Sequence, residues 1–292
     1  MLALAALASL PTGHPAAVAC DDRFAPAKDG EIAYRDCGDR TAAPVILVPG
    51  GPGLDASYVM PLADMIARLR HRVIVLEPRG TGASRSALGD GTQLTVAGSI
   101  ADVEAVRRAA GVEKAVLFGH SFGGAVAQAY AAAFPGRVGT LLLMDSAGPG
   151  GPPPKPLDGW RKRGTADELA RYDTFRANGD RIGAMRIKFA LSFFHKPAGE
   201  RFLASLPDAA IHMDVMPLSV RYEHDFHTAP MTRTPFPVTL VSGQIDWIRG
   251  YEPAFKATYP RLHLFVVPGA GHFPWADAPR ATQRVLARAL GD

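Results

Sequence analysis

The chain has 292 residues, 47% of them hydrophobic, which is enough for one sizeable domain or for a domain that carries a smaller insertion. Its 32 Lys and Arg residues and 28 Asp and Glu residues leave a formal net charge of +4, and the basic residues are scattered. This distribution argues against a nucleic-acid-binding protein, which would gather its basic residues into a patch or stripe. The densest basic run, residues 161–163, lies beside a proline-rich stretch and is interpreted as the start of a solvent-exposed helix.

The N-terminal segment is similar to an export signal. Residues 2–10 are almost wholly apolar, and the first Asp, Glu, Lys or Arg of the chain is Asp21. The run is too short to span a bilayer, and residues 17–19 (AVA) fit the small-x-small pattern that signal peptidase cleaves. We therefore expect residues 1–19 to be a signal peptide, cleaved after Ala19, and the mature protein to be periplasmic or secreted. Because no Lys or Arg precedes the apolar run, a hydrophobic tail on a cytoplasmic protein is the alternative.

Cys20 and Cys37 are the only cysteines, and both would lie near the start of the mature chain. In an oxidising compartment they could pair, and a bridge that closes such a loop would stabilise the fold by about 3 kcal/mol. Two unpaired thiols in a cytosolic enzyme are the alternative. Acylation of Cys20 is disfavoured, because Ala17 stands where lipoprotein signals usually have Leu. The cysteine spacing does not match a metal site.

Strand-like and helical segments alternate from residue 31 to residue 144. The later strand-like segments are continuously apolar, which is typical of buried parallel strands. The expected strands are residues 31–34, 45–48, 73–76, 115–118 and 141–144, and the expected helices are residues 62–69, 99–110 and 125–134. This order predicts an α/β fold, with a mostly parallel sheet flanked by helices.

The alternation stops at residues 147–154, where Gly and Pro make a regular element unfavourable. From residue 157 to about residue 230 the pattern is helical and contains no convincing strand. The expected later elements are helices at residues 167–177 and 181–194, strands at residues 238–241 and 264–267, and a helix at residues 279–290. The simplest arrangement is a sheet core made of residues 20–147 and 235–292, interrupted by a linker and helical cap over residues 148–234.

Residues 119–123 read GHSFG, a G-x-S-x-G pattern that many proteins contain by chance. Here the pattern follows an expected strand and opens an expected helix, which is the context that the catalytic version requires. Glycines on both sides let the backbone pack tightly around a strained serine, and the N–H groups at the start of the helix favour an anion there. Ser121 is therefore the predicted nucleophile; a structural serine in a tight turn is the alternative.

A serine hydroxyl needs a histidine to take its proton and an acid to fix the tautomer of that histidine. His272 lies in a glycine-rich turn just past the last expected strand, whereas His120 belongs to the serine turn itself. Four other histidines fall in the expected cap: His195, His212, His224 and His227. We predict His272 as the base.

Asp246 follows the expected strand at residues 238–241 and precedes His272. It completes the chain order Ser, Asp, His that is typical of this type of site, so we predict it as the acid. Asp145, just past the strand at residues 141–144, is the alternative acid. Residues 49–53 (PGGPG) follow another strand and could supply the Gly51 N–H to an oxyanion hole, with the Phe122 N–H as the second donor. A glycine-rich turn without catalytic function is the alternative for that loop.

With these residues identified, the chain resembles the proline iminopeptidase branch of the α/β-hydrolases over nearly the whole mature length. That family has His-Gly-Gly-Pro-Gly, then Asp-Gln-Arg-Gly-x-Gly-x-Ser, then a G-x-S-x-G turn. This chain has PGGPG at residues 49–53, EPRGTGAS at residues 77–84 and GHSFG at residues 119–123. Pro49 replaces the histidine of the family and residues 77–78 (EP) replace Asp-Gln, which affects the aminopeptidase assignment more than the hydrolase one.

The resemblance also implies a cap carboxylate that binds the free amino group of the substrate. Residues 221–226 (RYEHDF) are similar to the segment that carries it, and Glu223 is the matching position. A solvated helix acid is the alternative. Four aromatic residues are expected as apolar pocket walls, with core packing as the alternative: Phe193, Phe194, Tyr222 and Trp275.

The sequence thus predicts hydrolysis of an amide or ester through an acyl-enzyme, in which Ser121 attacks, His272 is base and then acid, and Asp246 orients it. Peptides with a free N-terminus are the expected substrates. A small-molecule esterase or lactonase is the first alternative, and a non-catalytic binding protein on a hydrolase scaffold is the second. This chemistry requires no metal and no organic cofactor.

Overall fold

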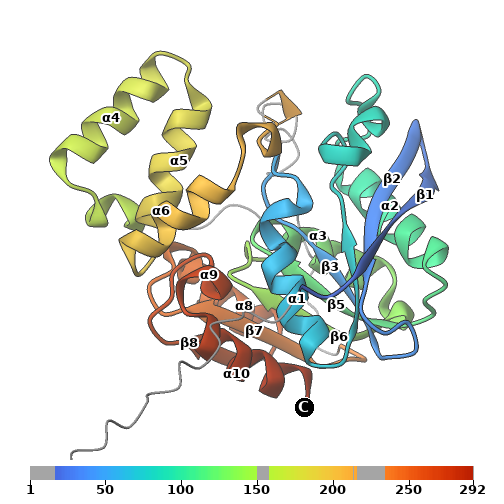
Figure 1. Ribbon diagram of the computed structural model, residues 1–292. Helices are drawn as coiled ribbons and strands as arrows, with labels where there is room; N and C mark the ends of the chain where they lie inside the picture. Colours follow the sequence, from blue (N-terminus) through green and yellow to red (C-terminus); the bar gives the residue numbers. More distant parts are fainter. Residues whose placement is uncertain (1–16, 150–157, 213, 216–233, 292) are drawn as a thin grey trace, which may run out of the picture.

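An eight-stranded sheet forms the centre of the structure, a computed structural model that describes residues 17–149, 158–212, 214–215 and 234–291 (Figure 1). The strand order is β1-β2-β4-β3-β5-β6-β7-β8. The strands are β1 (Cys20–Ala27), β2 (Gly30–Cys37), β3 (Pro44–Val48), β4 (Arg72–Leu76), β5 (Ala115–His120), β6 (Val138–Met144), β7 (Val238–Gly243) and β8 (His263–Val267). The pairs β1–β2 and β2–β4 are antiparallel and all the others are parallel, so the α/β fold with a mostly parallel sheet is confirmed.

The seven strands expected from the sequence are present, and β1 is an additional strand that the sequence pattern did not predict. β1 lies at the edge of the sheet and pairs with β2. Most of its residues are exposed, Ala25 is its one buried residue, and Phe24 keeps half of its surface in contact with solvent. An edge strand of this kind has no apolar run from which it could be predicted.

Alternate residues of the central strands enter two hydrophobic layers, one on each face of the sheet. In β3, Ile46 and Val48 belong to the first layer, whereas Val45 and Leu47 belong to the second. Helices α2 (Val96–Ala109), α3 (Phe122–Ala133) and α8 (Glu252–Thr258) contribute to the first layer, and α1 (Met60–Arg68), α9 (Pro274–Asp277) and α10 (Pro279–Leu290) contribute to the second. Because both faces are covered, the central strands are apolar on both sides.

The described part of the expected cap contains three α-helices that lie together beside the sheet domain, α4 (Ala166–Ala177), α5 (Arg181–Leu191) and α6 (Lys196–Ser205) (Figure 1). The helix expected over residues 181–194 ends earlier, at Leu191. The turn that follows is attached to the core, because the carboxylate of Asp277 accepts the backbone N–H groups of Phe194 and His195. α6 is a separate helix that the sequence pattern did not single out.

The basic run at residues 161–163 ends a 3₁₀ helix, Gly159–Arg163, so the expectation that it starts a solvated helix is wrong. The guanidinium of Arg161 lies 5.4 Å from the ring centroid of Trp160. Arg163 donates hydrogen bonds to two carbonyl oxygens in the turn after α5. Two of the three basic side chains, Arg161 and Arg163, therefore stabilise the segment at which the cap begins.

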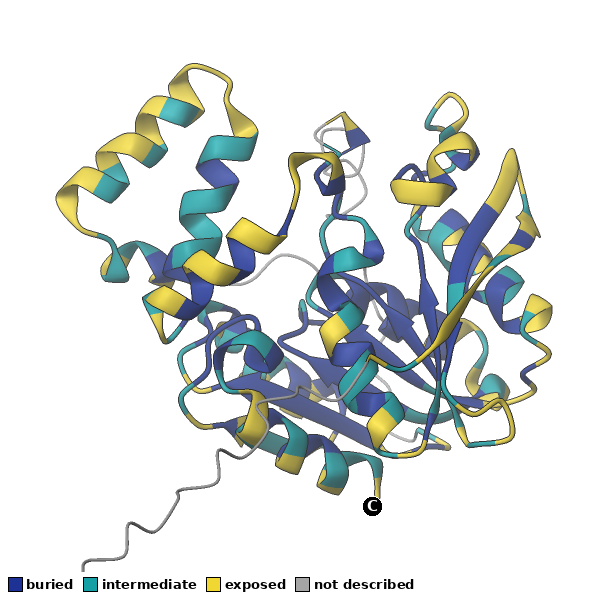
Figure 2. Ribbon diagram, viewed as in Figure 1, coloured by how far each residue is buried: buried dark blue, intermediate teal, exposed yellow. Residues whose placement is uncertain are grey.

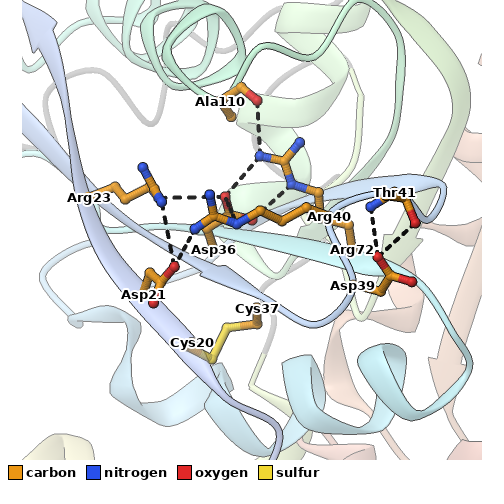
Figure 3. A network of polar contacts seen from close by, with 10 residues as sticks. All are labelled: Cys20, Asp21, Arg23, Asp36, Cys37, Asp39, Arg40, Thr41, Arg72 and Ala110. Carbon is orange, nitrogen blue, oxygen red and sulfur yellow. Dashed lines mark hydrogen bonds and ion pairs between the residues drawn. A yellow bond between two sulfur atoms is a disulfide. The ribbon is translucent and has the colours of Figure 1, made fainter.

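A disulfide joins β1 to β2 at Cys20 and Cys37, which lie directly opposite each other. Next to it, the buried carboxylate of Asp36 accepts two hydrogen bonds of 2.8 Å from Arg72 in β4, and two further arginines pair with it (Figure 3). Although burial raises the pKa of Asp36, the hydrogen bonds and charge of Arg72 bring that pKa below its ordinary value. The disulfide thus closes the N-terminal hairpin, and the ion pair between Asp36 and Arg72 ties that hairpin to β4.

The predicted signal peptide lies mostly outside the described residues. Of its last three residues, Val18 donates its N–H to Asp64 and Ala19 accepts the N–H of Gly38 through its carbonyl oxygen. In the described part of the chain, no helix has the length and apolar character that a membrane crossing requires. Cleavage after Ala19 stays a prediction.

Candidate active site

Ser121 lies in the sharp turn between β5 and α3. Its φ of +54° is rare for a residue with a side chain, and such strained turns recur at functional sites. A Cβ on Gly119 would lie 2.5 Å from the carbonyl oxygen of Gly123, and a Cβ on Gly123 would lie 2.2 Å from that of Val48. Because both positions have room for glycine only, the GHSFG sequence can hold Ser121 at the end of β5, with the first turn of α3 behind it.

His272 follows β8 and faces Ser121. Its Nε2 lies 3.1 Å from the Oγ of Ser121, and its ring is almost fully buried. The backbone N–H of His272 donates to the carbonyl oxygen of Ser192, and a Cβ on Gly271 would lie 1.9 Å from that oxygen. The glycine-rich turn therefore lets the chain pass close beneath the cap, which directs the imidazole toward Ser121.

Asp246 contacts the other side of the same imidazole. Its two carboxylate oxygens lie 3.1 and 3.0 Å from the Nδ1 of His272, and one of them also accepts the N–H of Ile248. Burial alone would raise the pKa of Asp246, but the charge and hydrogen bond of His272 bring it below its ordinary value. These surroundings favour an ionised Asp246, and a carboxylate beside Nδ1 favours the tautomer of His272 that leaves Nε2 as the hydrogen-bond acceptor facing Ser121.

Asp145, the alternative acid, lies against Asp246 rather than against His272. It follows β6 with a φ of +44°, and one of its oxygens accepts the N–H of Gly243 at 2.7 Å. Its side chain is fully buried, and burial together with the neighbouring Asp246 charge raises its pKa well above the ordinary value. These surroundings favour a neutral Asp145 beside an ionised Asp246.

The loop after β3 lies directly against Ser121. A Cβ on Gly50 would lie 2.7 Å from the Cβ of Ser121. The N–H of Gly50 is bound by the hydroxyl of Tyr58 at 2.5 Å, and Gly51 follows with a φ of +135° that favours glycine. Gly51 and Phe122, the predicted oxyanion donors, are thus on two segments that meet at Ser121.

Glu77 ties this loop to the one that follows β4. Its buried carboxylate accepts the N–H of Ala56 at 3.0 Å and the hydroxyl of Thr81 at 2.7 Å. A Cβ on Gly82 would lie 2.7 Å from the carboxyl carbon of Glu77. Burial raises the pKa of Glu77 above its ordinary value. Residues of the EPRGTGAS motif therefore support the loop that carries Gly51.

A cavity of about 50 Å³ lies between the PGGPG loop and helices α2 and α3. Apolar side chains make up much of its wall: Leu76, Leu94, Val103, Phe122, Val126 and Val215. The polar pair Arg79 and Asp102 also lines it, and these two charges bind each other in a buried salt bridge. The cavity has room for a small apolar group next to the nucleophile turn. Among the described residues, no group of three His, Cys, Asp or Glu could hold a metal ion.

The aromatic residues predicted as pocket walls have other surroundings. Phe193 is fully buried and stacks on Phe273 at 5.2 Å, and Trp275 is buried against the ring of His120 at 4.8 Å. Neither lines the cavity beside the nucleophile turn, so the structure favours the core alternative for both. Phe194 is half-buried in the turn after α5. Tyr222 and Glu223 lie outside the described residues, so their roles stay predictions.

Two residues of the site carry no motif from which they could be predicted. The indole ring of Trp247 lies 5.1 Å from the imidazole of His272, and its N–H donates to the hydroxyl of Ser192. Its position directly after Asp246 is the one sequence signal for it. Tyr58, whose hydroxyl binds the N–H of Gly50, belongs to none of the sequence motifs.

Comparison with known proteins gives a consistent family. The family model described as the alpha/beta hydrolase fold matches residues 43–279. The solved structure of a 2-hydroxy-6-oxo-6-phenylhexa-2,4-dienoate hydrolase from Rhodococcus superimposes with a TM-score of 0.72, covering 94% of this chain and 100% of that chain at 22% identity. That likeness concerns the fold alone.

Curated relatives match part of the chain, and two of them are described here. A proline iminopeptidase of Neisseria meningitidis is 33% identical over 120 residues, which are 39% of this chain and 36% of that protein. A 2-hydroxy-6-oxononadienedioate/2-hydroxy-6-oxononatrienedioate hydrolase of Paraburkholderia phymatum is 34% identical over 133 residues, 44% and 45% of the two proteins. Each match spans less than half the length of the relative.

Proposed function

This chain belongs to the α/β-hydrolase fold family, and from that premise we propose that it is a serine hydrolase that cleaves an amide or ester through an acyl-enzyme. In this proposal Ser121 is the nucleophile, His272 is the general base and then the general acid, and Asp246 orients His272. The observation that carries the proposal is the single line of contacts from Asp246 through His272 to Ser121, at 3.0 and 3.1 Å.

The chemical steps follow from these contacts. The Nε2 of His272 takes the hydroxyl proton as the Oγ of Ser121 attacks the substrate carbonyl carbon, and the imidazolium that forms is stabilised by the Asp246 carboxylate. The imidazolium then gives its proton to the leaving amine or alcohol, which leaves an ester on Ser121. Water activated by the same Nε2 hydrolyses this ester and regenerates the serine.

The negative charge of the tetrahedral intermediate requires hydrogen-bond donors beside Ser121. We assign this role to the N–H groups of Gly51 and Phe122, helped by the positive end of the α3 dipole. Support comes from the close approach of the loop, since a Cβ on Gly50 would lie 2.7 Å from the Cβ of Ser121. Removal of one such donor typically costs about 2.7–4 kcal/mol in the transition state.

For the substrate, we propose peptides with a free N-terminus, as for an aminopeptidase of proline iminopeptidase type. Partial similarity to a protein of that name supports this proposal, and so do the PGGPG, EPRGTGAS and GHSFG segments, which resemble the motifs of that family. A small-molecule carboxylesterase or lactonase is the second candidate, and the small apolar cavity beside the nucleophile turn is compatible with its acyl groups. In that case Glu223 has no part in binding.

A fluorophosphonate probe tests the nucleophile. We expect the folded wild type to be labelled and Ser121→Ala to be unlabelled, with the exposed Ser86→Ala as the matched control that keeps full labelling. Absence of labelling in folded wild type would favour the remaining alternative, a binding protein without catalysis. Mass spectrometry of the labelled peptide identifies the modified residue.

Comparison of a prolyl anilide with short acyl esters tests the substrate class. The aminopeptidase proposal expects turnover of the anilide, and Glu223→Gln should reduce this turnover while ester hydrolysis stays unchanged, because only the peptide substrate has an ammonium group to bind. Normal cleavage of amino-acyl anilides by Glu223→Gln would contradict the amino-anchor role.

We also propose that the protein is exported and that residues 1–19 are removed. The disulfide between Cys20 and Cys37 supports this proposal, since such bonds persist in oxidising compartments. Mass spectrometry of the mature protein should find Cys20 at the N-terminus. An intact N-terminus on protein recovered from the cytoplasm would contradict it.

A further inference from the structure

Tyr58 and His120 form a chain of hydrogen bonds beneath the candidate active site. The hydroxyl of Tyr58 accepts the N–H of Gly50 at 2.5 Å and lies 2.9 Å from the Nδ1 of His120. The Nε2 of His120 lies 3.0 Å from the carbonyl oxygen of His272. These hydrogen bonds thus join three segments that are far apart in the sequence: the loop after β3, the nucleophile turn and the turn that carries His272.

One arrangement of protons satisfies every contact in this chain. Because the Tyr58 oxygen accepts from Gly50, its own hydroxyl proton is available for the Nδ1 of His120. With Nδ1 as an acceptor, the neutral imidazole carries its proton on Nε2, which donates to the carbonyl oxygen of His272. His120 is therefore required as the Nε2–H tautomer.

The two side chains that make these hydrogen bonds, Tyr58 and His120, are buried and uncharged. Tyr58 and His120 are 3% and 1% exposed, and the rings of Phe273 and Trp275 pack against them. Burial first, and then the neighbouring His272, lower the pKa of His120 to about 3, so its imidazole stays neutral at neutral pH. A neutral imidazole with both nitrogens engaged cannot compete with His272 for the Ser121 proton.

We propose that Tyr58 and His120 are positioning residues for the hydrolysis, a brace that sets the oxyanion loop and the His272 backbone at their working distance from Ser121. The proposal rests on the proposed function, since it concerns the same site. Gly50 links the brace to the predicted donor Gly51, which follows it in the chain. The carbonyl of His272 links it to the residue that takes the proton.

The brace should affect the rate more than substrate binding. Tyr58 and His120 contact backbone groups of the catalytic segments, and displacement of reacting groups by about 1 Å can cost on the order of 10²-fold in rate. An oxyanion donor acts mainly on the transition state, so its displacement lowers kcat with little change in KM. A purely structural role would instead lower stability and leave kcat unchanged.

The first test compares two deletions of a buried tyrosine hydroxyl. Tyr58→Phe removes the acceptor for Gly50 and the donor for His120, whereas Tyr130→Phe removes a hydroxyl that donates to Glu104, away from the site. We expect Tyr58→Phe to lower kcat and the rate of fluorophosphonate labelling by about 10- to 100-fold with KM within about twofold, and Tyr130→Phe to leave both rates near wild type. Equal rates in the two variants would overturn the proposal.

A second pair of variants divides the brace in two. Asn at position 120 offers an amide oxygen near the Nδ1 position, and Gln offers an amide N–H near the Nε2 position. His120→Asn should therefore keep the contact with Tyr58, and His120→Gln should keep the contact with the His272 carbonyl. We expect both to retain more kcat than His120→Ala, and equal kcat in all three would overturn the brace even if Tyr58→Phe did not fold.

NMR of the wild type with labelled histidine ring nitrogens tests the brace without any substrate. His120 should be the Nε2–H tautomer and should not titrate between about pH 5 and pH 8. A titrating His120, or the Nδ1–H tautomer, would overturn the brace whatever the activity. Absence of labelling at Ser121 would count against the proposed function instead, so the two failures are distinguishable.

Discussion

The edge of the sheet that carries Ser121 and the described part of the cap differ in how tightly they are packed. At the sheet edge, the chain segments around Ser121 and His272 are buried and approach so closely that several glycines have no room for a Cβ. In the cap, α4 has no buried residue and its outer face is open to solvent (Figure 2). In the first region, displacement of an atom by a few tenths of an ångström should disturb the packing. The second region should tolerate substitutions that keep its helices intact.

The largest effect expected at the sheet edge comes from substitution of Asp246, the proposed acid. Asp246→Asn keeps the shape of the side chain but no longer holds the Nδ1 proton of His272, so kcat should fall on the order of 10⁴-fold in steady-state assays. Asp145→Asn is the matched variant, and because its surroundings favour the neutral carboxyl, we expect kcat within a few-fold of wild type. The reverse order would make Asp145 the catalytic acid.

The raised pKa of Asp145 predicts that the free energy of unfolding depends on pH. A carboxyl whose pKa is raised in the folded state binds more protons there than in the unfolded state. The stability that Asp145 contributes therefore falls as the pH rises above 3.8, the ordinary pKa of an aspartate. Asp145→Asn cannot titrate. Its free energy of unfolding, measured in urea at several pH values, should therefore gain on that of wild type as pH rises from about 4. A constant difference would mean that Asp145 has an ordinary pKa.

Gly123→Ala should break the close packing of the same region. Its Cβ would lie 2.2 Å from the carbonyl oxygen of Val48, so the loop after β3 must move away from Ser121. We expect destabilisation of at least about 1–3 kcal/mol in urea unfolding and loss of most fluorophosphonate labelling. Gly136→Ala is the control, because a Cβ there meets nothing within 4 Å. Normal labelling of Gly123→Ala would show that the sheet edge is less rigid than its packing indicates.

Loss of the disulfide should lower stability and leave the chemistry unchanged. The bridge between Cys20 and Cys37 joins an edge hairpin on the opposite side of the sheet order from β7 and β8, whose loops carry Asp246 and His272. Cys37→Ser, with Cys20→Ser to avoid a free thiol, should cost about 3 kcal/mol of unfolding free energy with kcat unchanged. Wild type under reducing conditions should match it, and a large loss of kcat would instead link the hairpin to the site.

The smallest effect is expected in the cap. The hydroxyl of Thr165 caps α4 by accepting the N–H of Glu168, and the carboxylate of Glu168 accepts the N–H of Thr165. Thr165→Ala should cost about 1 kcal/mol, with activity unchanged. Thr174→Ala within the same helix is the control and should be neutral, because its hydroxyl only binds the carbonyl of Ala170. Impaired turnover in Thr165→Ala would assign α4 a part in substrate binding.

Sequence patterns predicted the central elements because burial on both faces leaves a continuous apolar run, as in β3 and β4. They did not predict β1, an edge strand with mostly exposed residues, and they misplaced residues 161–163, whose arginines bind an aromatic ring and backbone carbonyls. Phe193 and Trp275 were expected as pocket walls, with core packing as the alternative, and both are buried in the core. For an aromatic residue, the sequence does not distinguish these places, since both require an apolar side chain.

By itself, the sequence determined the α/β order and the position of the turn that carries Ser121, because glycines at 119 and 123 and the flanking strand and helix are local properties of the chain. Only the tertiary structure decided that Asp246, and not Asp145, contacts His272, and that Tyr58 and His120 join three segments of the candidate site. Those contacts join residues 26 to 152 positions apart, so they depend on how parallel strands bring their carboxyl ends to one edge of the sheet.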